Sequence, residues 1–371
     1  MPKINMTTIP PYRTSAITTD YIVLVNLAKI SGIERFVNEN SDAIRNALLN
    51  ISSYTPAVQR LIPLVYGNTK KFDLFDQLPN QIKCYLHDTT LKLVAYECIK
   101  YDWLTKIITL FNNNDIPLIL LKGSAFNGNL YPNETLRAGS DIDILIKQSD
   151  YNRACEVLDN NNYLQQYNSR PGVYDTLFES SYKPKMANGV VIDLHKSLTH
   201  PALFHIDENE IWEASNPHPA YNTGQVRILS PEHTLLHLAV HAFRDYNFCT
   251  HNLLDTHEVV YQSKPDEKLL INYAKSWGAC HILYCLLKNC QIAMDSPIDR
   301  NTLLNLKPCI VKDTLSKFVL KSHTTADQRE KTMKHRIAQV LGLTLFPDNL
   351  YQGFRLTRDY LSARLDRSNK Q

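Results

Sequence analysis

Two aspartates separated by one residue are the side chains of this sequence best suited to do chemistry. Asp141 and Asp143 lie in the otherwise apolar segment 141–146. Since side chains alternate between the two faces of a strand, both carboxylates would project to the same side. Magnesium ions in proteins are usually held by one or two carboxylates together with substrate phosphates. The pair therefore predicts a Mg²⁺ site, and the alternative is a strand edge that carries two solvated acids.

A third acid follows in a second apolar segment. Asp193 lies within residues 190–195, where the alternation of side chains again predicts a strand. If this strand lies beside the first, three carboxylates converge, as in sites where two metal ions about 4 Å apart support phosphoryl displacement. We expect Asp193 to complete the metal site or to accept the proton of an incoming hydroxyl. The alternative is a polar residue on a half-exposed strand.

A Lys-Gly-Ser turn precedes the acids and could hold phosphate. The apolar run 116–121 predicts a strand that ends at Lys122, Gly123 and Ser124. Gly123 would let a phosphate approach the backbone, Ser124 could donate a hydrogen bond, and Lys122 would add positive charge. A short helix over 124–130 would start with unpaired amides that attract anions. The alternative is an ordinary turn capped by the serine.

The elements that must position these residues divide the chain into three predicted parts. Helical periodicity dominates residues 1–112, strands dominate 113–200 with one helix at 151–160, and helices return in 201–371, where Ser230 and Pro231 begin one. The predicted fold class is α+β, with a small mixed β-sheet flanked by N-terminal and C-terminal helical regions.

The composition is that of an ordinary soluble protein. The 371 residues are 44% hydrophobic and 21% charged, and the net charge of +3 is too small to argue for nucleic acid. No apolar run reaches the length of about 20 residues that a membrane helix needs, so we expect a cytoplasmic protein without a membrane partner. The eight cysteines show no Cys-x-x-Cys spacing, which argues against zinc knuckles and redox motifs.

Two further patterns have plain structural readings. His233, His237 and His241 recur every four residues, and we favour a packed histidine stripe over a metal site. Basic residues in 355–370 favour a solvated amphipathic helix over a contact with RNA or an acidic partner.

The residues named above resemble the bacterial nucleotidyltransferase-like family of the polymerase-beta-type nucleotidyltransferase superfamily. The matching residues are Lys122, Gly123, Tyr131, Arg137, Asp141, Asp143 and the segment Asp193-Leu194-His195, while His241 and Asp255 resemble positions of a helical region in the relatives. The resemblance implies that the core of the fold is a nucleotidyltransferase sheet, that Gly123 and Ser124 hold a triphosphate and that the three acids hold magnesium. Arg137 would steer phosphate, the alternative being a solvated loop arginine. Ser140 is counted with Lys122, Gly123, Ser124 and Arg137 among the nucleotide-binding residues, the alternative being that it only shapes the turn before the acids.

The predicted activity is magnesium-dependent transfer of a nucleoside monophosphate. A nucleoside triphosphate such as ATP would be attacked at its alpha phosphorus by an acceptor hydroxyl, and pyrophosphate would leave. The acceptor is left open between a protein, a sugar, a small molecule and RNA. The alternatives are a kinase, which would release nucleoside diphosphate, and a non-catalytic scaffold that binds a nucleotide or a peptide.

Overall fold

The computed structural model contains two compact units. One, the sheet unit, comprises Leu91–His233, and the other, the helical unit, comprises Met1–Thr90 with Thr234–Gln371. The predicted core segment 113–200 lies within the sheet unit, which extends beyond it at both ends. The residues described are 19–54, 56–132, 136–166, 178–186, 188–199, 203–221, 224–244, 251–322, 341–342, 344–349, 351, 353–354 and 357–358.

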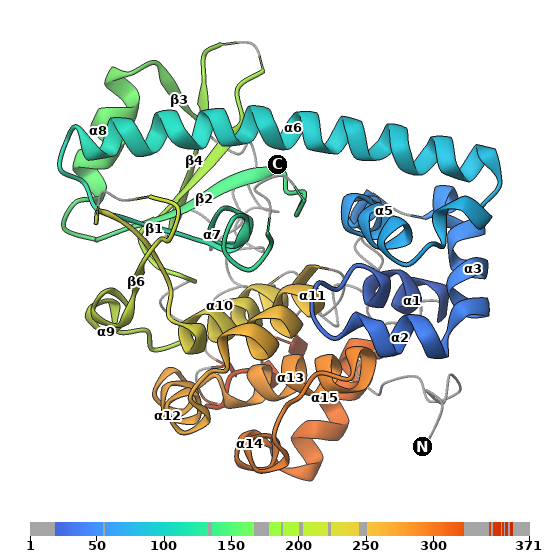
Figure 1. Cartoon of the computed structure of the whole chain (residues 1–371). Coiled ribbons are helices and arrows are strands. Elements are labelled where there is room, and N and C mark those ends of the chain that lie inside the picture. Colours follow the sequence, from blue (N-terminus) through green and yellow to red (C-terminus); the bar gives the residue numbers. More distant parts are fainter. Residues whose placement is uncertain are drawn as a thin grey trace, which may run out of the picture. The chain divides into compact units, whose positions relative to one another are not determined.

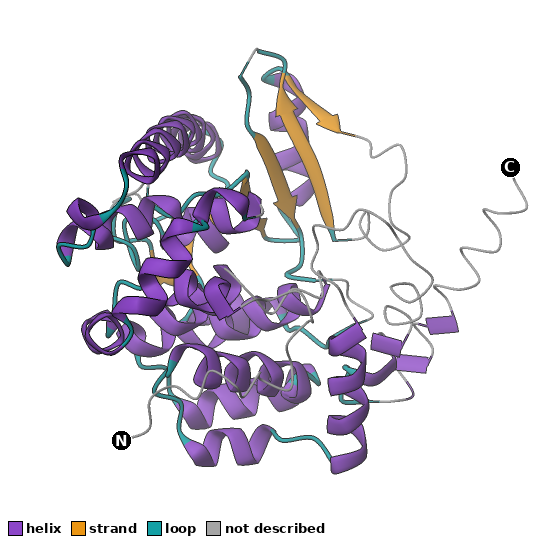
Figure 2. Cartoon of the chain, turned by 90° about the vertical axis from the view of Figure 1, so that its right-hand side faces the viewer, coloured by secondary structure: helices purple, strands orange, loops and turns teal. Residues whose placement is uncertain are grey.

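The sheet unit contains a mixed β-sheet with helices around it. Its strands are β1 (Leu118–Leu120), β2 (Asp141–Ile146), β3 (Tyr163–Gln166), β4 (Glu179–Pro184), β5 (Val191–His195), β6 (Asn216–Pro217) and β7 (Val226–Ile228). Its helices are the second part of α6 (Asn80–Asn112), α7 (Lys122–Phe126), α8 (Tyr151–Asn160), α9 (Glu208–Ala214) and the start of α10 (Pro231–Arg244). Within the described residues the sheet has seven strands in the order β3-β4-β5-β2-β1-β7-β6. Figure 2, in which strands are orange, shows strands of this sheet side by side. The predicted α+β class with a mixed sheet is confirmed.

Strand β2 lies in the middle of the sheet, between β5 and β1. It pairs with β5 in parallel and with β1 in antiparallel orientation. Ile142, Ile144 and Ile146 are fully buried, and each such side chain contributes about 1.5–3 kcal/mol to folding. This apolar face fixes the register, because a slip of one residue would bring the two aspartates into the core instead.

Helix α8 connects the central strands to β3. It spans Tyr151–Asn160, the predicted bounds, and buries Tyr151, Ala154 and Leu158. The hydroxyl of Tyr151 donates to the carbonyl oxygen of Leu194 in β5 at 3.2 Å. Helix and sheet are therefore joined by both apolar packing and a hydrogen bond.

The turn after β1 differs from the prediction. The expected helix over 124–130 begins earlier, at Lys122, and ends at Phe126. It ends there because Asn127 takes an extended conformation and its side chain pairs with the backbone of Arg137 in both directions, at 3.2 Å each. These two bonds join Asn127, directly after α7, to Arg137.

The helical unit contains the predicted N-terminal and C-terminal helices. They are α1 (Thr19–Leu27), α2 (Ile33–Glu39), α3 (Ser41–Leu49), α4 (Pro56–Gln59), α5 (Ile62–Lys71), α11 (His251–Glu258), α12 (Glu267–Trp277), α13 (Cys280–Met294), α14 (Arg300–Leu306) and α15 (Ile310–Ser322), together with the first part of α6 and the rest of α10. Short 3₁₀ turns at Ile51–Ser53 and Phe75–Gln77 and a π-helical turn at Val259–Ser263 complete it (Figure 1).

Helices from the two ends of the sequence pack together in this unit. Lys29, which follows α1, donates from Nζ to the carbonyl oxygen of Met294 in α13, and the buried carboxylate of Glu258 accepts the amides of Ile30 and Ser31. Burial lowers the pKa of Lys29 to about 8. These bonds tie the segment after α1 to α11 and α13.

The structure describes the three histidines of α10 but not most of the basic segment 355–370. His233 and His237 are buried in α10, and the rings of His237 and His241 lie 6.3 Å apart, while Asp255 is fully buried in α11. The histidines are thus packed side chains. The basic residues Arg355, Arg364, Arg367 and Lys370 lie outside the described residues.

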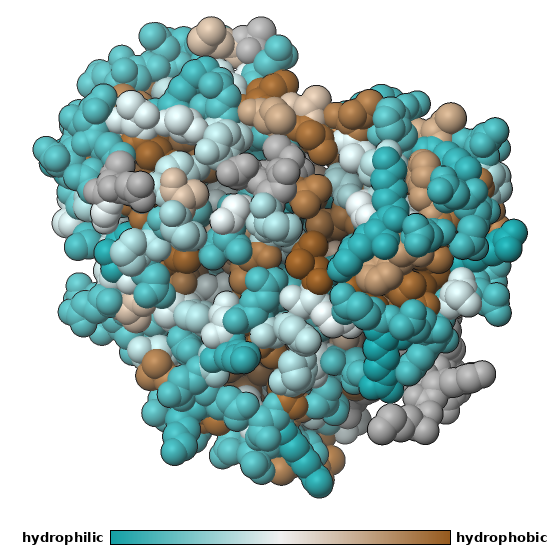
Figure 3. Space-filling view, in the orientation of Figure 1, coloured by the Kyte–Doolittle hydropathy of each residue, from teal (hydrophilic) through white to brown (hydrophobic). Residues whose placement is uncertain are grey.

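Of the helices that the structure describes, not one is long and apolar enough to cross a bilayer. Hydrophilic side chains cover much of the face shown in Figure 3, with smaller apolar areas between them.

Candidate active site

The three acids predicted from the sequence lie on adjacent strands of the sheet. Asp143 of β2 is in register with Asp193 of β5, and Asp141 stands opposite Val191. Because the strands are parallel and in register, residues paired in this way project to the same face about 4.8 Å apart. Asp141, two residues before Asp143, shares that face. The structure therefore brings the three predicted acids together.

This polar face extends into β4 as well. Ser181 is paired with Asp193, and Glu179 is paired with His195. The Ser181 hydroxyl donates to Oδ1 of Asp193 at 2.5 Å. Nε2 of His195 lies 3.0 Å from Oδ1 of Asp143, and its Nδ1 lies 3.4 Å from Oε2 of Glu179. Polar side chains from three neighbouring strands thus share one face of the sheet, where they form two bonded sets.

Asp143 is the acid that the protein itself neutralises. Asp143 is only 3% exposed. The Nζ atom of Lys122 lies 2.7 Å from Oδ1 of Asp143. Burial alone would raise the pKa of Asp143, but Lys122 and the hydrogen bond from His195 more than offset it and hold the pKa well below its usual range. The carboxylate is therefore ionised and held in one orientation.

Asp141 and Asp193 are in the opposite electrostatic situation. Burial and the negative charge of Asp143 raise the pKa of Asp141. Burial also raises the pKa of Asp193, and the charge of Asp143 adds to this effect while the Ser181 hydroxyl counteracts it. Asp141 and Asp193 thus lie close to the negative charge of Asp143. Their remaining contacts do not fully offset the cost of burying their carboxylates.

These carboxylates match the ligand chemistry of magnesium. Hard divalent cations take oxygen ligands, and Mg²⁺ keeps several waters and binds through one or two carboxylates plus substrate phosphates. Within the described residues no group of three or more His, Cys, Asp or Glu side chains is placed to hold a metal ion by itself. The residues that could hold Mg²⁺ are Asp141, Asp143 and Asp193, with phosphate oxygens as further ligands. A cation bound there would lower the pKa of Asp141 and of Asp193, which burial raises.

The predicted phosphate turn lies at the end of β1, where α7 begins. Lys122 adopts a left-handed backbone conformation with φ of +47°, which costs about 1–2 kcal/mol for a residue other than glycine. The amide of Leu121 donates to the carbonyl oxygen of Asp143 at 3.1 Å. This connection to β2 holds the turn in the position from which the lysine side chain reaches the acid.

Arg137 covers the open side of Gly123. A Cβ at Gly123 would lie 2.5 Å from Nη1 of Arg137, and the guanidinium lies over the ring of Phe126, 5.6 Å from its centre. Arg137 is only 8% exposed, so it is not a solvated loop residue. A phosphate approaching Gly123 would meet this cation as well as the backbone.

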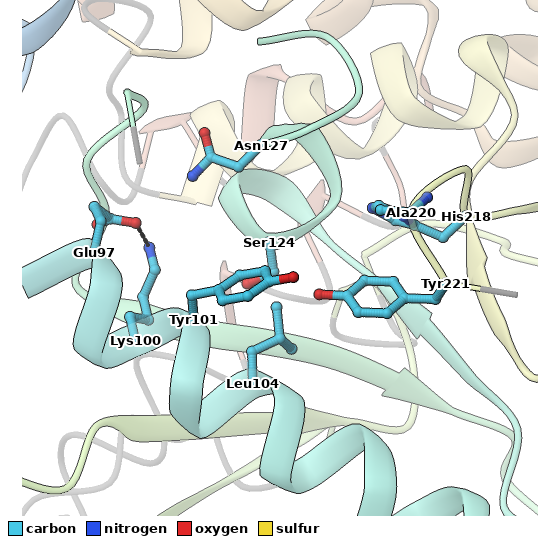
Figure 4. Close-up of a pocket in the computed structure, with 9 residues that line it drawn as sticks. All are labelled: Glu97, Lys100, Tyr101, Leu104, Ser124, Asn127, His218, Ala220 and Tyr221. Atoms are coloured by element: carbon cyan, nitrogen blue, oxygen red, sulfur yellow. Dashed lines mark hydrogen bonds and ion pairs between the residues drawn. The ribbon is translucent and has the colours of Figure 1, made fainter. Parts of the chain in front are cut away.

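The remaining predicted residues, Ser124 and Ser140, have different surroundings. Ser140 is exposed, and its carbonyl oxygen accepts a hydrogen bond from Tyr96 of α6 at 2.9 Å. Ser124 is 7% exposed, and it lines a small pocket with residues of α6 and of the segment after β6 (Figure 4).

Helix α6 contributes a buried ion pair that the sequence did not point to. Lys100 and Glu97 are 2.7 Å apart, and Oε1 of Glu97 accepts the amide of Gly139 at 2.7 Å. Burial lowers the pKa of Lys100, and Glu97 and Asp141 oppose that shift by their charge. The pair fastens the segment before Asp141 to the helix. A spacing of three residues between opposite charges was its only signal in the sequence.

No role was predicted for Ser181 and Glu179. Residues 179–184 do not alternate regularly between polar and apolar side chains, so no local pattern pointed to these two residues. Only the pairing of β4 with β5 brings them to the acids.

Comparison with known proteins identifies a family for the chain. No curated protein and no solved structure matches the chain. A family model described as an uncharacterised nucleotidyltransferase matches residues 54–295, which include every predicted site residue. Because this match covers well over half of the sequence, the chain belongs to this nucleotidyltransferase family and is a nucleotidyltransferase.

Proposed function

We propose that this nucleotidyltransferase transfers a nucleoside monophosphate from a nucleoside triphosphate to an acceptor hydroxyl in a reaction that requires Mg²⁺. The observation that supports this proposal is the in-register pairing of Asp143 with Asp193, with Asp141 on the same face and Lys122 bonded to Asp143. Oxygen ligands for a cation and a positive charge for phosphate thus lie at one place.

The three acids have two functions in the proposed reaction, binding of Mg²⁺ and acceptance of a proton. Asp141, Asp143 and Asp193 would hold Mg²⁺, which neutralises charge on the phosphates when it is bound. The acceptor oxygen forms a bond to the alpha phosphorus while the bond to the bridging oxygen breaks and pyrophosphate leaves. Asp193 would also accept the proton of the acceptor hydroxyl.

Lys122 and Arg137 are the positively charged side chains that we expect to contact the triphosphate. Lys122 reaches Asp143 with Nζ at 2.7 Å, and Arg137 lies against Gly123 at the start of α7. In the proposed complex both side chains contact phosphate oxygens, Lys122 as a point charge and Arg137 as a planar donor of several hydrogen bonds. Fixed charges of this kind act mainly by stabilising charge that develops in the transition state.

Label transfer tests the reaction class. The protein is incubated with Mg²⁺, a cell extract as the source of acceptor, and each nucleoside triphosphate labelled at either the alpha or the gamma phosphate. We expect product that contains the alpha label, together with release of pyrophosphate. Transfer of the gamma label with release of nucleoside diphosphate would instead identify a kinase.

A binding measurement covers the case in which the extract lacks the acceptor. We expect titration calorimetry to show Mg²⁺-dependent binding of nucleoside triphosphate to the wild type and its loss in Asp141→Asn. Asp102→Asn, which changes an exposed acid on α6, is the matched control and should bind normally. Absence of both label transfer and binding would refute the proposal.

A further inference from the structure

The pocket beside α7 is built from three separate parts of the sheet unit. Its cavity volume is about 20 Å³, somewhat more than the roughly 10–15 Å³ that one water needs by the same measure. Helix α6 contributes Tyr101 and the Glu97–Lys100 pair, α7 contributes Ser124, and the segment after β6 contributes His218 and Tyr221. In Figure 4 the hydroxyl ends of the two tyrosines point toward one another across the pocket. There is room for a small polar group and not for a ring.

His218 presents a hydrogen-bond donor without an acceptor among the described residues. Its Nδ1 accepts the amide of Ala220 at 3.1 Å, and burial lowers the pKa of the ring to about 4. A neutral imidazole carries a single proton, and because Nδ1 is an acceptor that proton is on Nε2. The residue is 3% exposed, and Nε2 has no partner among the described residues.

Ser124 presents a second unsatisfied group to the same pocket. Its hydroxyl is buried, and it too has no partner among the residues that the structure describes. Buried polar groups are nearly always hydrogen-bonded in folded proteins, and an unsatisfied donor costs free energy. Two of them in one pocket point to a bound group that accepts hydrogen bonds.

The pocket lacks the net positive charge that would favour an anion as the bound group. The positive charge of Lys100 is matched by Glu97 at 2.7 Å, and His218 is neutral at physiological pH. Phosphates would be attracted instead to Lys122, which lies two residues before Ser124 on α7. The pocket and the predicted phosphate turn therefore belong to the same short helix.

We propose that this pocket binds a ribose hydroxyl of the nucleoside triphosphate, with Nε2 of His218 and Oγ of Ser124 as its hydrogen-bonding partners. This inference rests on the proposed function, since it assigns a part of the same substrate. The ribose is the part of a nucleotide attached directly to the alpha phosphate, and its hydroxyls both accept and donate hydrogen bonds. One hydroxyl also matches the size of the cavity.

Binding of matched ligands tests the assignment without requiring the acceptor. Calorimetry in Mg²⁺ would compare ATP, 2′-deoxy-ATP, 3′-deoxy-ATP and inorganic tripolyphosphate with the wild type, Ser124→Ala and His218→Phe. We expect the wild type to prefer ATP over one deoxy analogue by about tenfold, the effect of about one net hydrogen bond. Both variants should lose that preference, and His218→Phe should keep its affinity for tripolyphosphate. Lys106→Ala, an exposed change on α6, is the control and should retain the preference.

The possible failures are distinguishable. Equal affinity of the wild type for ATP and for both deoxy analogues would overturn the ribose assignment and leave the proposed transfer intact, and so would an unchanged preference in Ser124→Ala. A wild type that binds neither ATP nor tripolyphosphate would overturn the proposed function and the ribose assignment together. Because Ser124→Ala removes a single oxygen, it keeps the test decisive even if His218→Phe does not fold.

Discussion

Lys122 and Asp143 form an ion pair, with Nζ 2.7 Å from Oδ1, where the end of β1 meets β2. The side chain expected to contact phosphate is thus bonded to a side chain expected to contact metal. His195 approaches the same oxygen at 3.0 Å. The three acids are therefore not equivalent, because Asp143 is neutralised by the protein while Asp141 and Asp193 have their pKa values raised.

The first prediction concerns the stability of the Asp143→Asn protein without metal. This change leaves the ammonium of Lys122 without its partner, although its side chain is only 15% exposed. We expect a loss of about 3 kcal/mol in the free energy of unfolding, as for other buried pairs from which one partner is removed. Urea denaturation measures it. A loss below about 1 kcal/mol, the value of a surface pair, would contradict the assigned role of the ion pair.

The second prediction is that Asp141→Asn has the opposite effect on stability, and that this effect depends on pH. The pKa of Asp141 is raised in the folded state, so its carboxylate opposes folding once the pH exceeds that folded-state pKa. Asparagine resembles the protonated acid. We therefore expect the variant to be more stable than the wild type at neutral pH without metal, and the advantage to disappear as the pH falls below the unfolded value of about 3.9.

Urea denaturation of both proteins across this pH range checks the sign. Asp150→Asn, at a more exposed acid that is paired with Arg153, is a control that should show no such advantage at neutral pH. An Asp141→Asn protein that is less stable than the wild type at neutral pH would contradict the second prediction.

The individual elements of the site followed from the sequence because their signals are local. The alternation of isoleucine and aspartate in β2 and the helical period of α8 depend only on neighbouring residues. The start of α7 did not follow, since it depends on Lys122 taking a left-handed conformation that places its side chain on Asp143. No pattern within the turn itself contains that information.

The connections between distant segments were beyond sequence reasoning for a different reason. Ser181 reaches Asp193 only because β4 and β5 pair in one register, and Glu97 reaches Gly139 only because α6 packs beside the loop. Which distant strands become neighbours, and where a helix packs, depend on tertiary packing that no local pattern in either segment specifies. The positions of the acids were therefore predictable, and their hydrogen-bonding partners were not.

The third prediction concerns the contact between Gly123 and Arg137. In Gly123→Ala the new Cβ would lie 2.5 Å from Nη1, so the guanidinium must move. Because the displaced atom is the end of a flexible side chain, we expect the fold to survive. Affinity for tripolyphosphate in Mg²⁺ should fall about tenfold, by the loss of one charged hydrogen bond.

Another glycine provides the matched control. A Cβ at Gly67, inside α5, would meet nothing within 4 Å. Gly67→Ala should therefore leave binding unchanged and raise the free energy of unfolding by about 0.5–1 kcal/mol. Unchanged tripolyphosphate affinity in Gly123→Ala would show that Arg137 does not contact phosphate.

The fourth prediction tests Asp193 as the proton acceptor through its neighbour Ser181. The Ser181 hydroxyl donates to Asp193 at 2.5 Å and lowers the pKa of the carboxyl, against the larger effect of burial. Ser181→Ala removes this donor, so the pKa of Asp193 should rise further. A base with a higher pKa is protonated at higher pH, and the acid limb of the rate profile should therefore shift to higher pH.

The measurement is the rate of alpha-label transfer as a function of pH for the wild type, Ser181→Ala and Ser181→Thr, the last of which keeps the hydroxyl. Ser180→Ala is the control, because Ser180 pairs with Leu194 and belongs to the other face of β4. A structural disturbance of the strand would lower the rate equally at every pH, whereas loss of the hydrogen bond moves the acid limb. An acid limb at the same pH in Ser181→Ala and in the wild type would exclude Asp193 as the base, because the position of that limb reports the pKa of the group that accepts the proton.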